Sequence, residues 1–260
     1  MAPASVRPGH ARTRALRSAE ADSVLACTFE RLSTMSASAS GMPADGTSDA
    51  PELTVVHLMR HGEVHNPEGL LYGRLEGYRL SDLGEQMAVV VAQHLEPNDI
   101  THVVASPLER AQQTATPVAE AHDLPIATDE RVIEAANHFE GRSVGMSDLL
   151  HPRNWHLFGN PRTPSWGEPY EEIAERMLSA IDDARRTAHG HEAVIVSHQL
   201  PIWTARNKLT GRRLWHDPRR RECTLASLTS LTYAGDELSS ITYSEPAVAL
   251  LGQASRSVGA

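Results

Sequence analysis

The chain has 260 residues and 40% of them are hydrophobic, which is enough to bury one sizeable core and predicts one main domain. Its net charge of -9, from 33 acidic and 24 basic residues, argues against a surface that coats nucleic acid but is compatible with a small basic pocket. Only two cysteines occur, and no stretch approaches the roughly 20 apolar residues needed to cross a bilayer. We therefore expect a cytoplasmic protein with neither a membrane nor a nucleic acid as its partner.

Residues 1–50 differ in composition from the rest of the chain. They are rich in Ala, Ser, Pro, Gly and Thr and have no sustained apolar period, so they cannot bury enough surface to offset the entropy of ordering. We interpret them as a disordered extension. It is dispensable, or it lies before a real start at Met35 or Met42, or, given the arginines near its beginning, it is a transit peptide. Residues 51–246 form the expected domain, and residues 247–260 are interpreted as a flexible tail.

The first predicted element of the domain is a buried strand, indicated by the short apolar run LTVVHLM at residues 53–59. The polar segment RHGEVHNP follows it as a loop. Ser81 can cap a helix over residues 82–95, with Glu85 in place for a capping box, and Pro97 ends this helix. The first unit is therefore a strand, a loop and a helix.

A second unit of the same kind follows. THVVAS at residues 101–106 predicts a strand, and the next helix has Pro107 in its first turn and runs to about residue 122. Residues 137–167 are then irregular and contain Trp, His, Arg and Pro, so we interpret them as a small inserted cap.

A third strand is predicted for EAVIVS at residues 192–197, with a helix before it over 169–189 and one after it over 201–209. SLTSLTY and LSSITY, joined by the turn residues 234–236, predict a closing hairpin. Alternating strands and helices indicate a three-layer α/β/α sandwich with a largely parallel central sheet.

Polar motifs follow each of the three predicted parallel strands: RHG, SPLER and SHQ. In parallel sheets, ligands bind at the carboxyl ends of the strands. This topology would gather Arg60, His61, Arg110 and His198 around one crevice.

These side chains suit a phosphate monoester, whose phosphoryl oxygens need fixed cationic donors. Arg60 and Arg110 stay charged and donate two hydrogen bonds each, and a protonated His198 adds a third donor. His61 can attack phosphorus if one ring nitrogen is unprotonated and a backbone carbonyl orients the other.

The leaving alkoxide needs a proton, and Glu134 is the candidate donor, because a carboxyl group among phosphates or apolar walls would have a raised pKa. Glu63 is its rival. The spacing of His57, His61 and His65 would suit a metal on a helix, but the first of them lies in a predicted strand. We therefore expect neither a metal nor a cofactor.

Five motifs occur in order: LMRHGEVHN, LSDLG, SPLERAQQTA, VIEAANHFEG and VSHQLPI. Together they resemble the histidine phosphatase superfamily, also called the phosphoglycerate mutase-like family, over residues 53–245. The resemblance implies that His61 is the phosphorylated histidine and Glu134 the proton donor. It further implies a phosphate pocket completed by Arg60, Arg110 and His198, with phosphate-binding or structural roles for Asn66 and Glu63. Gln199 stands where the family commonly has a glycine.

The leading hypothesis is a metal-independent phosphatase that hydrolyses a small phosphorylated metabolite through a phosphohistidine on His61. A phosphoglycerate mutase-like phosphotransferase is the alternative, and a noncatalytic module that binds phosphoproteins is a third. The cap residues and Arg74 could recognise the substrate, whereas the arginine cluster at residues 212–221 is interpreted as a solvated face. The oligomeric state is left open.

Overall fold

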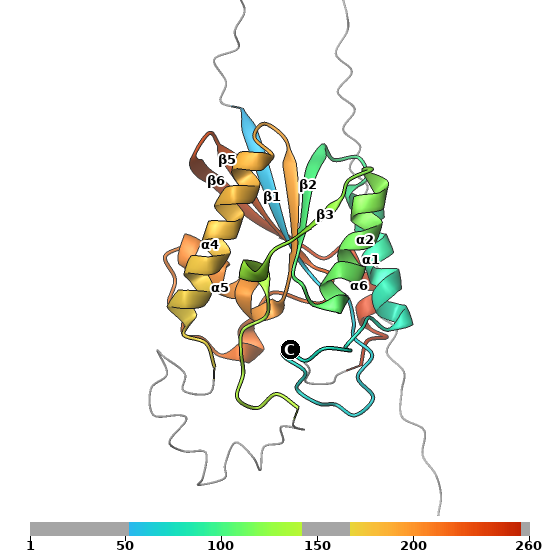
Figure 1. Ribbon diagram of the computed structural model, residues 1–260. Coiled ribbons are helices and arrows are strands. Elements are labelled where there is room, and N and C mark those ends of the chain that lie inside the picture. Colours follow the sequence, from blue (N-terminus) through green and yellow to red (C-terminus); the bar gives the residue numbers. More distant parts are fainter. Residues whose placement is uncertain (1–51, 142–166, 256–260) are drawn as a thin grey trace, which may run out of the picture. The chain divides into compact units, whose positions relative to one another are not determined.

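The residues that the computed structural model describes, 52–141 and 167–255, fold around one mixed sheet. Within this part of the chain the sheet has six strands in the order β3-β2-β4-β1-β5-β6 (Figure 1). The strands are β1 (Leu53–Arg60), β2 (Ile100–Ala105), β3 (Ile126–Thr128), β4 (Glu192–Ser197), β5 (Leu228–Ala234) and β6 (Glu237–Ser244). The first four are parallel to one another, and the last two form the antiparallel hairpin that the sequence predicts.

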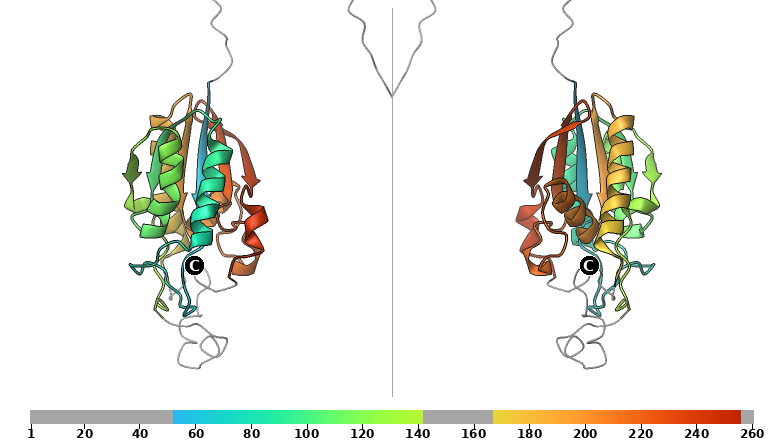
Figure 2. Two further views of the ribbon diagram at one scale, coloured as in Figure 1. Left: turned by 90° about the vertical axis from the view of Figure 1, so that its right-hand side faces the viewer. Right: turned by 90° about the vertical axis from the view of Figure 1, so that its left-hand side faces the viewer.

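Helices cover both faces of the sheet. They are α1 (Asp82–Leu95), α2 (Glu109–Ala121), α4 (Tyr170–Thr187), α5 (Gln199–Leu209) and α6 (Val248–Leu251). The pair α1 and α2 lies on one face, and the pair α4 and α5 lies on the other (Figures 1 and 2). The predicted three-layer sandwich with a largely parallel sheet is therefore confirmed.

The two apolar cores explain why the central strands are almost continuously hydrophobic. In β1, Val56 and Leu58 pack with the α4 and α5 side, while Met59 packs with the α1 and α2 side. Successive side chains of a strand point to opposite faces, so a strand covered on both sides must be apolar at most positions. Truncating a buried side chain of this size to alanine lowers the free energy of unfolding by about 2–5 kcal/mol.

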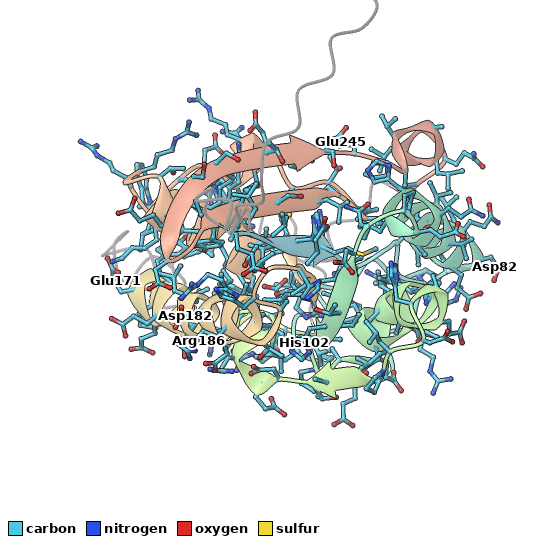
Figure 3. The ribbon with its side chains drawn as sticks, turned by 90° about the horizontal axis from the view of Figure 1, so that it is seen from above. Asp82, His102, Glu171, Asp182, Arg186 and Glu245 are labelled. Atoms are coloured by element: carbon cyan, nitrogen blue, oxygen red, sulfur yellow. The ribbon has the colours of Figure 1, made fainter. Side chains whose placement is uncertain are left out.

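The polar surface of the sandwich is clearest on α4. Ile173, Met177 and Ile181 face the interior, whereas Asp182 and Arg186 form an ion pair on the outer side of the helix (Figure 3). This one-sided pattern is typical of a helix that packs on a sheet. Among the described residues no helix is both long enough and apolar enough to span a membrane.

Helix α1 begins where the sequence predicts, but its cap differs. The Ser81 hydroxyl accepts a hydrogen bond from the Gly84 amide, as an N-cap should. The predicted capping box with Glu85 is wrong, because the Ser81 amide donates to the Glu63 carbonyl instead. A Cβ atom on Gly84 would lie only 2.0 Å from that carbonyl oxygen, so glycine lets the helix approach the loop closely.

Several boundaries also differ from the predictions. Helix α2 begins at Glu109, so Pro107 lies just before the cap residue rather than in the first turn, and α5 begins at Gln199. The short edge strand β3 was not predicted, since three residues after a proline carry no detectable alternation. The extension at residues 1–50 and most of the cap at 137–167 lie outside the described residues.

The first part of the predicted flexible tail is also corrected. Ala247 is buried, and α6 packs Leu250 and Leu251 against the core on the α1 side of the sheet. The sequence could not reveal this because a helix of four residues has no apolar period.

Candidate active site

The carboxyl ends of β1, β2 and β4 lie side by side, and the loops that leave them meet at one edge of the sheet (Figure 1). Arg60 is paired in register with Ser197 at the ends of β1 and β4. The His61 amide donates to the Ser197 carbonyl, and the Ser106 amide donates to the Val196 carbonyl. The three motif-bearing loops therefore start from one rigid platform, as the topology predicts.

Five sequence-predicted residues come together on this platform and are buried: Arg60, His61, Arg110, Glu134 and His198. The rings of the two histidines lie 5.1 Å apart between centroids. Each of the five carries one buried polar atom without a hydrogen-bond partner, and only three other such atoms occur among the described residues. The five atoms are Arg60 Nε, His61 Nε2, Arg110 Nε, Glu134 Oε2 and His198 Nδ1. Because leaving a buried polar group unpaired is costly, this concentration indicates a ligand site.

His61 is held in a single orientation. Its Nδ1 lies 2.7 Å from the Gly62 carbonyl oxygen, which can only accept, so Nδ1 carries the proton and Nε2 presents a lone pair. Burial, and then the charges of Arg110 and Arg60, lower the pKa of His61 well below its ordinary value. The Gly62 amide is in turn fixed by the Thr114 hydroxyl at 3.1 Å. This is the arrangement that nucleophilic attack by Nε2 requires.

The two arginines are anchored by backbone carbonyls rather than by carboxylates. Arg60 Nη1 donates to the Cys223 carbonyl at 2.7 Å, and Arg110 Nη2 donates to the Gly73 carbonyl at 2.6 Å. The Arg110 guanidinium also lies over the Tyr72 ring, 4.7 Å from its centroid. A carbonyl or a ring fixes the direction of a guanidinium without neutralising it, so both charges remain available for an anion.

His198 is positioned by a serine that the sequence did not single out. Its Nε2 lies 2.8 Å from the hydroxyl of Ser106, which also accepts a hydrogen bond from the Leu108 amide. The hydroxyl can donate to Nε2 and leave an N–H at Nδ1. Burial, followed by the charge of Arg110, lowers the pKa of His198 well below its ordinary value. Burial among cations thus favours a neutral His198 over the protonated one expected from the sequence, and the neutral ring still keeps a donor.

Glu134 and its rival Glu63 lie in different surroundings. Glu134 Oε1 accepts from the Ala135 amide at 2.8 Å, while Oε2 is free. Burial raises the pKa of Glu134, although the Ala135 amide and nearby arginines partly offset this. Both oxygens of Glu63 are occupied, by the Ser81 hydroxyl and the Ser255 amide, each at 2.6 Å. Glu63 therefore connects chain segments, and Glu134 alone of the two has an oxygen available to a ligand.

Two arginines, paired with one carboxylate, fix the backbone around Glu134. Arg74 Nε donates to the Glu134 carbonyl at 2.6 Å, and Arg176 Nη1 donates to the Ile133 carbonyl at 2.7 Å. Glu168 forms ion pairs with both arginines, at 2.8 Å and 2.7 Å. Arg74, which the sequence suggested as a substrate contact, is therefore part of the support beneath the carboxyl group.

Two other candidates have hydrogen-bond partners outside the cluster. Asn66 Nδ2 donates to the Leu70 carbonyl, and its Oδ1 accepts from the Leu70 amide, so its side chain closes its own loop. His57 contacts Ser230 and Glu192 within the sheet, which removes it from any group with His61. No cluster of three potential His, Cys, Asp or Glu metal ligands occurs in residues 52–141 and 167–255.

A cavity of about 390 Å³ opens beside Glu134. Besides Glu134, its wall includes Tyr170, Gln199, Arg219 and Arg221. Arg221 belongs to the arginine cluster that the sequence predicts to be a solvated face, and that prediction is wrong for this residue. The cap residues suggested for recognition, Arg142, Arg153, Trp155, His156, Arg162 and Trp166, lie outside the described residues.

Comparison with known proteins agrees with this geometry. Residues 56–245 match the family model of the histidine phosphatase superfamily (branch 1). The uncharacterized protein Rv0525 of Mycobacterium tuberculosis is 59% identical over 199 residues, which is 76% of this chain and 98% of that protein. The probable phosphoglycerate mutase GpmB of Yersinia enterocolitica is 33% identical over 186 residues, 66% of this chain and 82% of that protein.

Solved structures share the fold. The mycobacterial glucosyl-3-phosphoglycerate phosphatase Rv2419c has a TM-score of 0.60 and 22% identity, with 74% of this chain and 96% of that chain covered. The phosphoserine phosphatase of Entamoeba histolytica has a TM-score of 0.61 and 21% identity, with coverages of 74% and 98%. At these identities the likeness concerns the fold alone.

Proposed function

The chain belongs to the histidine phosphatase superfamily, and from this premise we propose that it is a metal-independent phosphatase that hydrolyses a small phosphate monoester through a phosphohistidine on His61. The observation that carries the proposal is the convergence of five buried, unpartnered polar atoms from Arg60, His61, Arg110, Glu134 and His198. They comprise one nucleophilic nitrogen, donors for the phosphoryl oxygens and one carboxyl oxygen. We keep the cytoplasm as the proposed compartment, on the basis of the low cysteine content.

In the first step, His61 Nε2 attacks phosphorus in line with the ester bond. A phosphorus–nitrogen bond forms while the bond from phosphorus to the leaving oxygen breaks. Arg60, Arg110 and the Nδ1–H of His198 stabilise the charge on the phosphoryl oxygens. Glu134 gives its proton to the leaving oxygen, which its raised pKa favours.

In the second step, water attacks the phosphohistidine. The Glu134 carboxylate, now without its proton, accepts one from this water as the new bond to phosphorus forms. The phosphorus–nitrogen bond breaks, and the products are inorganic phosphate, neutral His61 and protonated Glu134. The same carboxyl group thus serves as acid and then as base, and the enzyme returns to its starting state.

A phosphotransferase would use the same first step but pass the phosphoryl group to a second hydroxyl instead of water. The similarity to the probable mutase from Yersinia enterocolitica supports this alternative. Against it, both polar atoms of the Asn66 side chain are engaged with the Leu70 backbone. If transfer to an added acceptor is faster than release of inorganic phosphate, the phosphotransferase is the better assignment.

A noncatalytic module that binds phosphoproteins is a weaker alternative. Binding alone does not require an unprotonated nitrogen oriented by the Gly62 carbonyl or a buried carboxyl group with a raised pKa. Tight binding of phosphopeptides without turnover of any monoester would favour it.

The test is release of inorganic phosphate from p-nitrophenyl phosphate and a panel of phosphorylated metabolites, in buffer containing a metal chelator. We expect turnover in the chelator and a loss of about 2.7–4 kcal/mol of transition-state stabilisation in Arg110→Ala, by analogy with removing one charge-stabilising donor. Arg79→Ala is the matched control, because Arg79 is exposed and pairs with Glu109 at the surface. Activity that needs a divalent metal, or that survives in Arg110→Ala, would contradict the proposal.

A further inference from the structure

Arg221 is a half-buried cation in the wall of the cavity beside Glu134. Two of its three nitrogens are engaged: Nε donates to His216 Nε2 at 2.8 Å and Nη1 donates to Gln199 Oε1 at 3.2 Å. Its remaining nitrogen has no such partner among the described residues. These two hydrogen bonds fix the orientation of the Arg221 side chain and leave Nη2 available as a donor.

Both partners of Arg221 are uncharged. The Leu214 carbonyl accepts from His216 Nδ1, and Arg221 can only donate to His216 Nε2, so His216 is held as the neutral tautomer. Burial lowers the pKa of His216, in agreement with this state. Glu134 is the carboxyl group whose charge acts most on Arg221, and its own raised pKa favours the uncharged form. Within the described residues Arg221 forms no ion pair with a carboxylate, so its positive charge is not neutralised by a direct partner.

The other arginine of the cavity wall differs in this respect. Arg219 forms an ion pair with Asp217 at 2.9 Å and is largely exposed. Its charge is neutralised locally, as is common for surface ion pairs. The uncompensated positive charge in the wall is therefore that of Arg221.

Gln199 connects Arg221 to the phosphate site. Its Oε1 accepts from Arg221, and its Nε2 donates to the Cys223 carbonyl, the same oxygen that anchors Arg60. The Gln199 side chain therefore fixes the orientation of Arg221 and contacts the carbonyl oxygen that anchors Arg60.

We propose that Arg221 is a specificity-determining residue that binds a carboxylate on the alcohol part of the substrate, with Gln199 and His216 holding it in place. The inference rests on the proposed function, since it assigns the substrate class to the same site. A dianionic phosphoryl group has two arginines and a histidine in the neighbouring pocket. One arginine with two nitrogens already engaged matches a monoanionic carboxylate better than a second phosphate.

The experiment compares two probes with the same three-carbon skeleton. 3-Phosphoglycerate carries a carboxylate where glycerol 3-phosphate carries a hydroxymethyl group. We expect the ratio of kcat/KM for the first to that for the second to fall about tenfold in Arg221→Gln, the loss of one charge-assisted hydrogen bond. Arg221→Lys should retain part of the wild-type preference for 3-phosphoglycerate. Arg220→Gln removes the same charge from the next, exposed position and should keep all of it.

A binding measurement separates failure of this inference from failure of the proposed chemistry. In a His61→Ala background, calorimetric titration with the same two probes does not depend on turnover. We expect Arg221→Gln to weaken 3-phosphoglycerate about tenfold more than glycerol 3-phosphate. Equal weakening of both probes, or no weakening relative to Arg220→Gln, would overturn the inference even if the wild-type protein is an active phosphatase.

Discussion

His61 and Glu134 are both buried, yet burial moves their pKa values in opposite directions. An imidazole is charged when protonated, so burial lowers the pKa of His61, and the two arginines lower it further. A carboxyl group is charged when deprotonated, so burial raises the pKa of Glu134. One environment thus favours a free nucleophile and a protonated acid at the same pH, which is what the proposed first step needs.

Glu134→Gln tests the acid at the level of one atom. The variant keeps the shape but cannot donate a proton, so hydrolysis of alkyl phosphates should slow about 10²–10⁴-fold, whereas p-nitrophenyl phosphate, with a good leaving group, should slow far less. Steady-state kinetics with both substrates gives the comparison. Glu63→Gln is the control, because Glu63 only connects chain segments and should change both rates alike. Equal slowing of both substrates by Glu134→Gln would assign it a structural role.

The sequence predicts some site residues and not others for a physical reason. Arg60 ends β1, and His61 and His198 directly follow β1 and β4, whose ends meet, so the topology alone brings them together. Ser106 and Arg221 act through partners far away in the chain, His198 and Gln199, and such contacts leave no local pattern. A serine directly after a buried strand is the one signal that could have pointed to Ser106.

At the scale of elements, helix α1 and the His61 loop stabilise each other. The Ser81 hydroxyl accepts from the Gly84 amide at the start of α1 and donates to the Glu63 carboxylate in the loop. The Ser81 amide donates to the Glu63 carbonyl. The loop that carries His61 is therefore fixed by the helix cap as well as by the sheet.

Ser81→Ala should lower the free energy of unfolding by about 1 kcal/mol or more, because the helix loses its cap and a buried carboxylate loses a donor. Urea unfolding of the variant and the wild type measures this difference. Ser239→Ala removes a hydroxyl from an exposed position of β6 and should change stability by less than about 0.5 kcal/mol. Equal losses in the two variants would show that the cap contributes nothing.

Element predictions succeeded where the apolar pattern was long and failed where it was short. The main helices and the three parallel strands that carry motifs lie where periodicity predicts them. Strand β3 and helix α6 contain only three and four residues, and tertiary packing rather than local pattern decides their conformation.

At the scale of the whole molecule, strand order is the feature that sequence could not predict. β1 lies between β4 and β5, far along the chain from both, since crossover connections return the chain to the middle of the sheet. Because β4 lies between β2 and β1, the loop after β4 lies between the loop after β2 and the loop that carries His61. Alternating strands and helices predict the layers, but several strand orders would satisfy the same pattern.

The buried histidines should make the stability of the folded molecule depend on pH. His61 and His198 have a lowered pKa in the folded state, so below about pH 6.5 the unfolded chain binds protons that the folded chain does not. The free energy of unfolding therefore falls as the pH is lowered, by up to about 1.4 kcal/mol per pH unit for each histidine. Glu134 has the opposite effect. Its pKa is raised in the folded state, so above the ordinary pKa of a glutamate its contribution to the free energy of unfolding falls as the pH rises.

Urea unfolding at pH 7.5 and 5.5 tests this dependence. The wild type should lose more stability on acidification than His61→Ala, which lacks one of the buried histidines. His94→Ala removes an exposed histidine and should behave like the wild type. Parallel losses in all three proteins would mean that the buried histidine is not responsible.

The proposed mechanism requires that His61 carries the phosphoryl group during turnover. Because phosphohistidine is labile in acid, the direct test is the intact mass of the protein after rapid quenching at neutral or alkaline pH with a panel of phosphorylated metabolites, followed by mapping of the modified peptide. We predict a gain of one phosphoryl group on His61 in the wild type, together with release of inorganic phosphate, and neither in His61→Ala. Turnover in His61→Ala, or an adduct on another residue, would contradict the phosphohistidine mechanism.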